Sequence, residues 1–254
     1  MKKTDNKNWH IWISAAALIL GFFILHGPEK KPEVKDAKAY FVLGNSYFNG
    51  SHGYDLVKAE EALKKAVSVD PKIKFGHYQL ARVYFIEKKN KEALMEINKE
   101  LELNPENLRS LYVRGLIRAE TGNLPEAEND FRRFTAWAPK EWAGYNDLAW
   151  ILSKEGKYAA AAEVVLKSFR EVPDDEKNPW LQNSLGVAYL NLKKYSEAES
   201  AFEKAQKLAD NLNLNEWANA YPGNNKSMAP KGLNAFKEAI QENLRRTSLV
   251  DNSL

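Results

Sequence analysis

The chain has 254 residues, of which 44% are hydrophobic and 28% are charged, an ordinary balance for a folded protein with a sizeable core. Its 37 basic and 34 acidic residues leave a formal charge of +3, so the charge gives no indication of nucleic-acid binding, which needs clustered lysine and arginine. The absence of cysteine excludes disulfides, thiolate zinc sites, iron–sulfur clusters and thiol catalysis.

The chain begins with a short basic tail, residues 1–10, and an apolar segment follows it. From Ile11 to Leu25 this segment has no ionisable side chain, and its length is at the short end of what crosses a bilayer. Residues 11–26 are therefore predicted to form a transmembrane signal anchor. A cleaved signal peptide is the alternative, but the segment ends in the bulky residues Leu25 and His26 followed by Gly27 and Pro28, whereas cleavage needs small residues just before the cut.

The orientation of this segment is open, because lysines flank both of its ends. A very short basic tail usually stays in the cytoplasm, and this places the rest of the chain on the other side of the membrane. Residues 27–36 are expected to be a charged linker between the membrane and the folded domain.

A 34-residue period runs through the middle of the chain. Four prolines have this spacing: Pro71, Pro105, Pro139 and Pro173. Four alanines have it too: Ala59, Ala93, Ala127 and Ala161. Self-similarity at such a period is typical of solenoids built from helix pairs.

The residues around these positions resemble the tetratricopeptide-repeat (TPR) family, whose pattern is W-x2-L-G-x2-Y, then A-x3-F, then P. The last repeat, for example, has Leu185, Gly186, Tyr189, Ala198 and Phe202 at these positions. The resemblance implies an all-α fold, a right-handed superhelical solenoid of antiparallel helix pairs. Five repeats are expected within residues 37–210, at approximately 37–71, 74–105, 108–139, 142–173 and 179–210.

The pattern has a physical reading. Glycine or alanine on the first helix and alanine on the second let the two backbones approach closely, and proline ends the second helix because it cannot donate a backbone hydrogen bond. One pair cannot bury its apolar face alone, so several pairs must stack.

The end of the stack needs a polar cap. Residues 211–229 are predicted to be a loop, and residues 230–246 a capping helix with Leu233, Phe236, Ile240 and Leu244 along one side. A detachable helix that binds the membrane is the alternative, although its polar face is mixed in charge rather than basic. Residues 247–254 are expected to be disordered.

No motif in the sequence indicates catalysis. The four histidines lack metal-ligand spacing, and no nucleophile elbow, phosphate loop or dinucleotide fingerprint occurs. We therefore expect no enzyme activity, no cofactor, no metal and no small-molecule substrate.

The third repeat is unusual because Arg114 and Arg118 stand where apolar residues are typical, on a face where an unpaired charge is costly. We predict that Glu100 pairs with one or both arginines in a buried cluster between the second and third repeats. The cluster is either a structural ion pair or an anchor for a carboxylate of a partner.

TPR proteins usually bind peptides on the concave surface formed by the first helices, and this resemblance implies a partner-binding groove here. Its predicted residues are Phe41, Asn45, Phe48, Phe75, Tyr78, Gln79, Arg82, Phe85, Arg109, Tyr112, Leu116, Asn146, Trp150, Trp180 and Asn183. A third to a half of the aromatic residues should instead pack between repeats.

The chaperone-binding TPRs grip a C-terminal carboxylate with a Lys/Asn/Asn/Lys/Arg set. Here Asn45 fits and Arg109 substitutes for a lysine, but Phe41, Gln79 and Val113 depart from the set. We therefore expect an aromatic groove for an extended or helical segment rather than that clamp.

The arrangement resembles bacterial envelope TPR proteins that assist secretion, pilus or cytochrome assembly, or cell-wall synthesis. This implies a single-pass protein of the bacterial inner membrane with a periplasmic TPR domain, the cytoplasmic side staying open. The predicted function is a membrane-tethered scaffold or assembly factor with a protein partner that is itself membrane-associated. A homo-oligomeric structural protein is the alternative.

Overall fold

The structure is a computed structural model that describes residues 36–51, 53–220 and 229–251. The predicted basic tail, membrane anchor and almost all of the linker lie outside these ranges. Within them, no helix combines the length and the apolar character that a membrane crossing requires.

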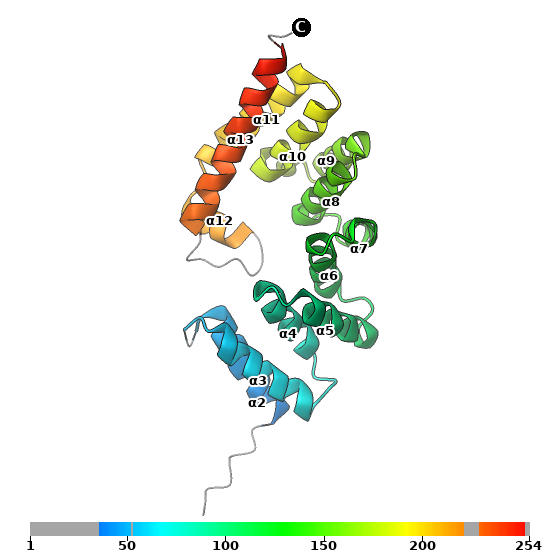
Figure 1. The fold of residues 1–254 in the computed structure, drawn as a ribbon, viewed down its shortest axis with the longest axis vertical. Helices are drawn as coiled ribbons and strands as arrows, with labels where there is room; N and C mark the ends of the chain where they lie inside the picture. Colours follow the sequence, from blue (N-terminus) through cyan, green and yellow to red (C-terminus); the bar gives the residue numbers. More distant parts are fainter. Residues whose placement is uncertain (1–35, 52, 221–228, 252–254) are drawn as a thin grey trace, which may run out of the picture.

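The described residues form helix pairs that succeed one another along an arc (Figure 1), and consecutive helices contact each other. The pairs are α2 (Ala37–Asn49) with α3 (Leu56–Val69), α4 (Gly76–Ile86) with α5 (Asn90–Leu103), α6 (Leu108–Glu120) with α7 (Leu124–Trp137), α8 (Trp142–Lys154) with α9 (Tyr158–Glu171), and α10 (Pro179–Asn191) with α11 (Tyr195–Asp210). A short 3-10 turn, η1 (Pro173–Lys177), precedes the last pair. The prediction of an all-α stack of helix pairs is confirmed.

The period of prolines marks the ends of the second helices. Helices α3, α5, α7 and α9 each end two residues before one of these prolines. Side-chain caps mark the starts of several helices: the Asp55 carboxylate accepts a hydrogen bond from the Lys58 amide at 3.0 Å at the start of α3, and Asn107 caps α6 in the same way. Local sequence therefore marks where these four second helices stop and where several helices start.

Glycine allows the two helices of a pair to touch. A Cβ atom on Gly186 would lie 2.5 Å from Cε1 of Phe202, which is fully buried, and one on Gly44 would lie 2.6 Å from Cγ of Leu63. Neither space can hold a methyl group without moving a core side chain.

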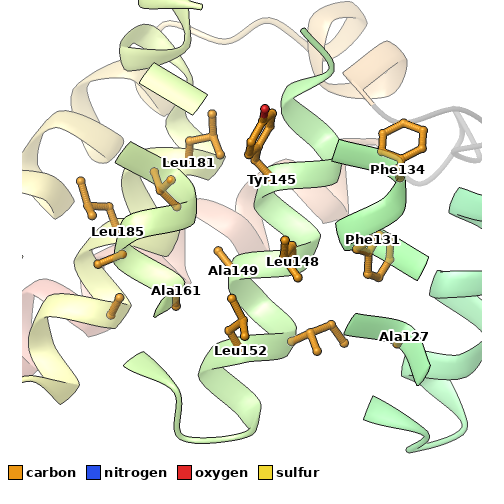
Figure 2. Close-up of a cluster of buried hydrophobic side chains, with 14 of the residues drawn as sticks. Ala127, Phe131, Phe134, Tyr145, Leu148, Ala149, Leu152, Ala161, Leu181 and Leu185 are labelled. Carbon is orange, nitrogen blue, oxygen red and sulfur yellow. The ribbon is translucent and has the colours of Figure 1, made fainter. Parts of the chain in front are cut away.

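Buried side chains fill the space between neighbouring pairs and form separate clusters along the stack. In Figure 2, Tyr145 and Leu148 of α8 lie between Phe131 and Phe134 of α7 on one side and Leu181 of α10 on the other. Tyr145 is the largest of the fully buried side chains. Because each pair buries its apolar face only against its neighbours, the stack behaves as one solenoid.

The C-terminal part differs from the prediction in two places. Helix α12 (Leu214–Ala220) lies inside the predicted loop 211–229, and helix α13 (Ala229–Asp251) continues through five residues of the predicted disordered tail. Helix α12 starts with a capping box that the prediction missed. Asn213 Oδ1 accepts from the amide of Glu216, and Glu216 Oε2 accepts from the amide of Asn213, each at 2.9 Å.

Helix α13 covers the last repeat, as the predicted cap would. Ile240 is fully buried against Phe202, Ala205 and Ala209 of α11. Thr247 is only 2% exposed and its hydroxyl donates to the Leu244 carbonyl at 2.6 Å, so packing and local hydrogen bonding hold the helix beyond its predicted end.

Candidate binding surface on the first helices

Helices α4, α6 and α8 lie on the inner side of the arc, and α5, α7 and α9 lie on its outer side (Figure 1). Helix α2 is the equivalent first helix of its pair. We call the surface of α2, α4, α6 and α8 on that inner side the inner face. Two rows of equivalent repeat positions run across it. The first row is Phe41, Tyr78, Tyr112 and Asn146, and the second is Asn45, Arg82, Leu116 and Trp150.

Arg82 is held between α2 and α4 by aromatic rings. Its guanidinium carbon lies 4.5 Å from the centre of the Phe48 ring and 5.5 Å from that of Tyr78. Its Nη1 donates to Oε1 of Gln79 at 2.9 Å. In the part of the chain that the structure describes, no carboxylate forms a salt bridge with Arg82.

The electrostatic surroundings of Arg82 are unfavourable for a cation. Burial lowers its pKa, and the positive charge of Arg109 lowers it further, while Tyr78 and Tyr54 act in the opposite direction. The guanidinium is therefore a half-buried, partly desolvated charge that the described residues do not neutralise.

A surface depression of about 640 Å³ adjoins this site, between the loops that lead into α4 and α6. Lys74, Phe75 and Arg109 line it together with Glu106. Phe75 adopts a φ of +63°, unusual for a residue with a side chain, and its ring meets that of Tyr78 edge-on at 6.3 Å. The depression therefore has an aromatic wall and two cations against one carboxylate.

Towards α8, the inner face carries polar side chains that form hydrogen bonds with one another. The Tyr112 hydroxyl donates to Oδ2 of Asp147 at 2.6 Å, and the Ser184 hydroxyl donates to Oδ1 of Asn146 at 2.8 Å. Asn146 also donates to Oδ1 of Asp147 at 3.4 Å. These bonds join α6, α8 and α10, so we read this half as a rigid polar floor.

The predicted groove residues differ in how far solvent reaches them. Phe48, Tyr78 and Tyr112 are each less than 9% exposed and pack mainly between repeats. Trp150 is 46% exposed, with the Lys154 ammonium 5.4 Å from its ring. The half-exposed residues are Phe41, Asn45, Phe75, Gln79, Phe85, Leu116 and Asn146, and Arg109 is exposed.

The α10 end of the predicted groove is covered by the C-terminal helices. Trp180 stacks on Trp217 of α12 at 5.3 Å and on Phe236 of α13 at 5.5 Å. Asn183 accepts a hydrogen bond from Asn243 of α13 at 3.3 Å. The prediction that Trp180 and Asn183 face an open groove is therefore wrong, because the cap of the solenoid packs on them.

The predicted pairing of Glu100 with the third-repeat arginines is also wrong. Arg114 and Arg118 both bind Asp130 of α7, which is fully buried, at 2.7 and 2.6 Å. Glu100 is buried too, and it accepts hydrogen bonds from the Tyr78 amide and from two asparagine side chains, Asn104 and Asn107.

The sequence prediction chose Glu100 on α5 as the acidic partner, whereas the partner in the structure is Asp130 on α7. It lies on the second helix of the same repeat, directly before Phe131, where the two helices of the pair face each other. The arginines are consequently occupied and offer no free anchor to a partner.

Among the described residues, no group of three histidine, aspartate or glutamate side chains is arranged to hold a metal ion. Among the described residues, the inner face offers aromatic rings, amides and the guanidinium groups of Arg82 and Arg109, neither of which forms a salt bridge with a described carboxylate.

Two parts of the stack match models of a known family of repeats. Residues 112–176 and residues 179–212 each match a model described as tetratricopeptide repeat. These two parts of the chain therefore carry tetratricopeptide repeats. A TPR repeat-containing protein of Pseudomonas aeruginosa is 27% identical over 150 residues, which are 58% of this chain. The chain spans only about a quarter, 25%, of the length of that curated relative.

Solved structures share the fold of this chain at low sequence identity. MamA of Desulfovibrio magneticus is 17% identical, with a TM-score of 0.62 over 68% of this chain and 95% of that one. YrrB, described as a TPR protein with an unusual peptide-binding site, is 19% identical, with a TM-score of 0.58 over 75% and 93%. PilF of Pseudomonas aeruginosa is 20% identical, with a TM-score of 0.59 over 84% and 89%.

Proposed function

We propose that this TPR protein is a membrane-tethered scaffold that holds a segment of a partner protein on its inner face. The observation that carries the proposal is that the inner face has both an unneutralised arginine, Arg82, which lies against aromatic rings, and the exposed ring of Trp150. Arginine and tryptophan are the residues most enriched where proteins bind each other.

The solenoid supports this proposal. A stack of helix pairs presents an extended inner surface, which suits a segment of extended chain or a helix better than a small molecule. YrrB has a peptide-binding site on a TPR fold of the same kind, and we extend that class of ligand to this chain as part of the proposal.

The tether belongs to the proposal through residues 11–26, which lie outside the described ranges. An anchor would confine the scaffold to the membrane surface and raise its effective concentration near membrane partners, so modest affinity would suffice. We place the anchor in a bacterial inner membrane and the solenoid on its periplasmic side. The proposed role includes binding and positioning of the partner, and no chemical step.

Site-specific crosslinking in cells tests the scaffold. A photoreactive amino acid replaces Trp150 on the inner face or, as a matched control, Trp137 on α7, which is 49% exposed. We expect a defined crosslinked protein from position 150 that is absent from position 137. Equal capture at both positions, or none at position 150, would contradict the proposal, and capture of a second copy of the chain would support the homo-oligomeric alternative.

A further inference from the structure

We propose that the bound segment is acidic and that one of its carboxylates pairs with the guanidinium of Arg82. The inference rests on the proposed function and names the chemistry of the partner at that surface. It assigns to Arg82 the role of a specificity-determining anchor, which is distinct from the aromatic contacts around it.

The first argument is the unmet charge. A guanidinium has five N–H groups, and among the described residues Arg82 has one hydrogen-bond acceptor, Oε1 of Gln79. Where the same chain buries arginine side chains in the third repeat, it supplies the carboxylate of Asp130. An arginine that is removed from water and left without an acid is favourable only if something else completes the pair.

The second argument is geometry. Phe48 and Tyr78 stack on the guanidinium and restrict its orientation, at 4.5 and 5.5 Å from their ring centres. A planar cation held in one orientation is suited to a carboxylate, which accepts two parallel hydrogen bonds from it. Less side-chain entropy is lost on binding because the arginine is already positioned.

The third argument is the local field and the unmet polar group beside it. Lys74 and Arg109 line the neighbouring depression with a single carboxylate, Glu106, so an acidic segment is attracted to the site and a basic one is repelled. Oδ1 of Asn45, on the same row as Arg82, is buried with no hydrogen-bond partner in the described residues.

Fluorescence anisotropy with defined peptides tests this. The probes are a short fluorescein-labelled peptide rich in Asp and Glu and its counterpart with Asn and Gln, each titrated with the 254-residue chain in detergent. We expect the acidic peptide to bind about tenfold more tightly, an advantage that falls when salt is raised. Arg82→Gln should abolish that advantage and Arg82→Lys should keep part of it.

The matched control is Arg133→Gln, since Arg133 also stacks on an aromatic ring, that of Trp137 at 5.5 Å, but lies on a second helix. It should leave both affinities unchanged, and thermal melts verify that each variant is folded. Equal binding of the two peptides, retention of the advantage in Arg82→Gln, or no binding of either peptide would overturn the acidic-partner inference. If a protein is captured at position 150 but its binding does not depend on Arg82 or on salt, the scaffold function is supported and the acidic-partner inference is overturned.

Discussion

Two arginine sites on neighbouring repeats are built in opposite ways. In the third repeat, Arg114 and Arg118 clamp the fully buried carboxylate of Asp130 from two sides. In the second repeat, Arg82 lies between Phe48 and Tyr78 and has no acidic partner among the described residues.

The difference distinguishes charges that are paired within the fold from a charge that can pair with a ligand. The third-repeat site closes on itself, so its charges hold the two helices of one pair in register and present nothing to a ligand. The second-repeat site is stabilised by aromatic rings and one neutral hydrogen bond to Gln79, and in our proposal the guanidinium takes a carboxylate from outside. Arginine thus stabilises the fold in the third repeat and, in our proposal, binds the partner in the second.

Removing the buried carboxylate should produce the largest effect. Asp130→Asn leaves two arginines without their anion, and we expect a loss of about 3–5 kcal/mol in the free energy of unfolding. Urea denaturation followed by circular dichroism measures it. The control is Glu163→Gln, which breaks an exposed pair with Arg170 and should change stability by less than about 1 kcal/mol. Similar losses in the two variants would show that the Asp130 cluster is not structural.

A close helix contact should give the next largest effect. Gly186→Ala adds a methyl group 2.5 Å from a ring atom of Phe202. Alanine gains about 1 kcal/mol of helix propensity, but overpacking costs about 1–3 kcal/mol, so a net loss of up to about 2 kcal/mol is expected. Thermal unfolding measures the change, with Ser200→Ala on the exposed side of α11 as the control. A gain in stability at position 186 would mean that the two helices can separate without cost.

A buried histidine outside the inner face should make stability depend on pH. His77 Nδ1 lies 2.5 Å from Oε2 of Glu96, and Lys99 binds the other oxygen of that carboxylate at 2.7 Å. The hydrogen bond to Glu96 raises the pKa of His77 in spite of burial. Burial alone would raise the pKa of Glu96, but the hydrogen bonds from His77 and Lys99 outweigh it and lower that pKa.

The sign follows from these directions. The contribution of His77 is fully present below its unfolded pKa of about 6.5 and is lost as the pH rises through the higher folded value. The contribution of Glu96 is present above about 4.5 and is lost as the pH falls through its lower folded value. The stability of the chain relative to His77→Gln should therefore decline in urea titrations as the pH rises above about 6.5, and a constant difference would contradict the ion pair.

The smallest stability effect is expected at Arg82. Arg82→Gln removes cation–π contacts worth about 0.5–1 kcal/mol each, and it also removes the cost of a desolvated charge, so the two changes partly cancel. Unfolding free energy should change by less than about 1 kcal/mol. A loss as large as that of Asp130→Asn would make Arg82 a structural residue and erase the contrast between the two sites.

The repeats were accessible from sequence because their signals are local and periodic. Prolines at a 34-residue spacing mark the ends of four second helices, and Gly186 marks a contact with Phe202 that no side chain on that position would allow. Helix α12 could also have been found, since Asn213 and Glu216 have the spacing of a capping box.

The partners of the charged residues could not be predicted from the sequence, because they depend on which helices face each other. Pairing Arg114 with Glu100 or with Asp130 is equally compatible with the sequence, and only the packing of α6 on α7 decides between them. The burial of Trp180 likewise depends on where α12 and α13 fold back, a long-range contact without a local signal.

The contrast between the two arginine sites can be tested in one titration. Nuclear magnetic resonance of the arginine Nε–H groups during addition of the acidic peptide reports on Arg82, Arg114 and Arg118 together. We predict that the Arg82 signal shifts in proportion to peptide bound, while those of Arg114 and Arg118 stay in place because Asp130 already holds them. Shifts at Arg114 or Arg118 with an unchanged Arg82 would contradict the account.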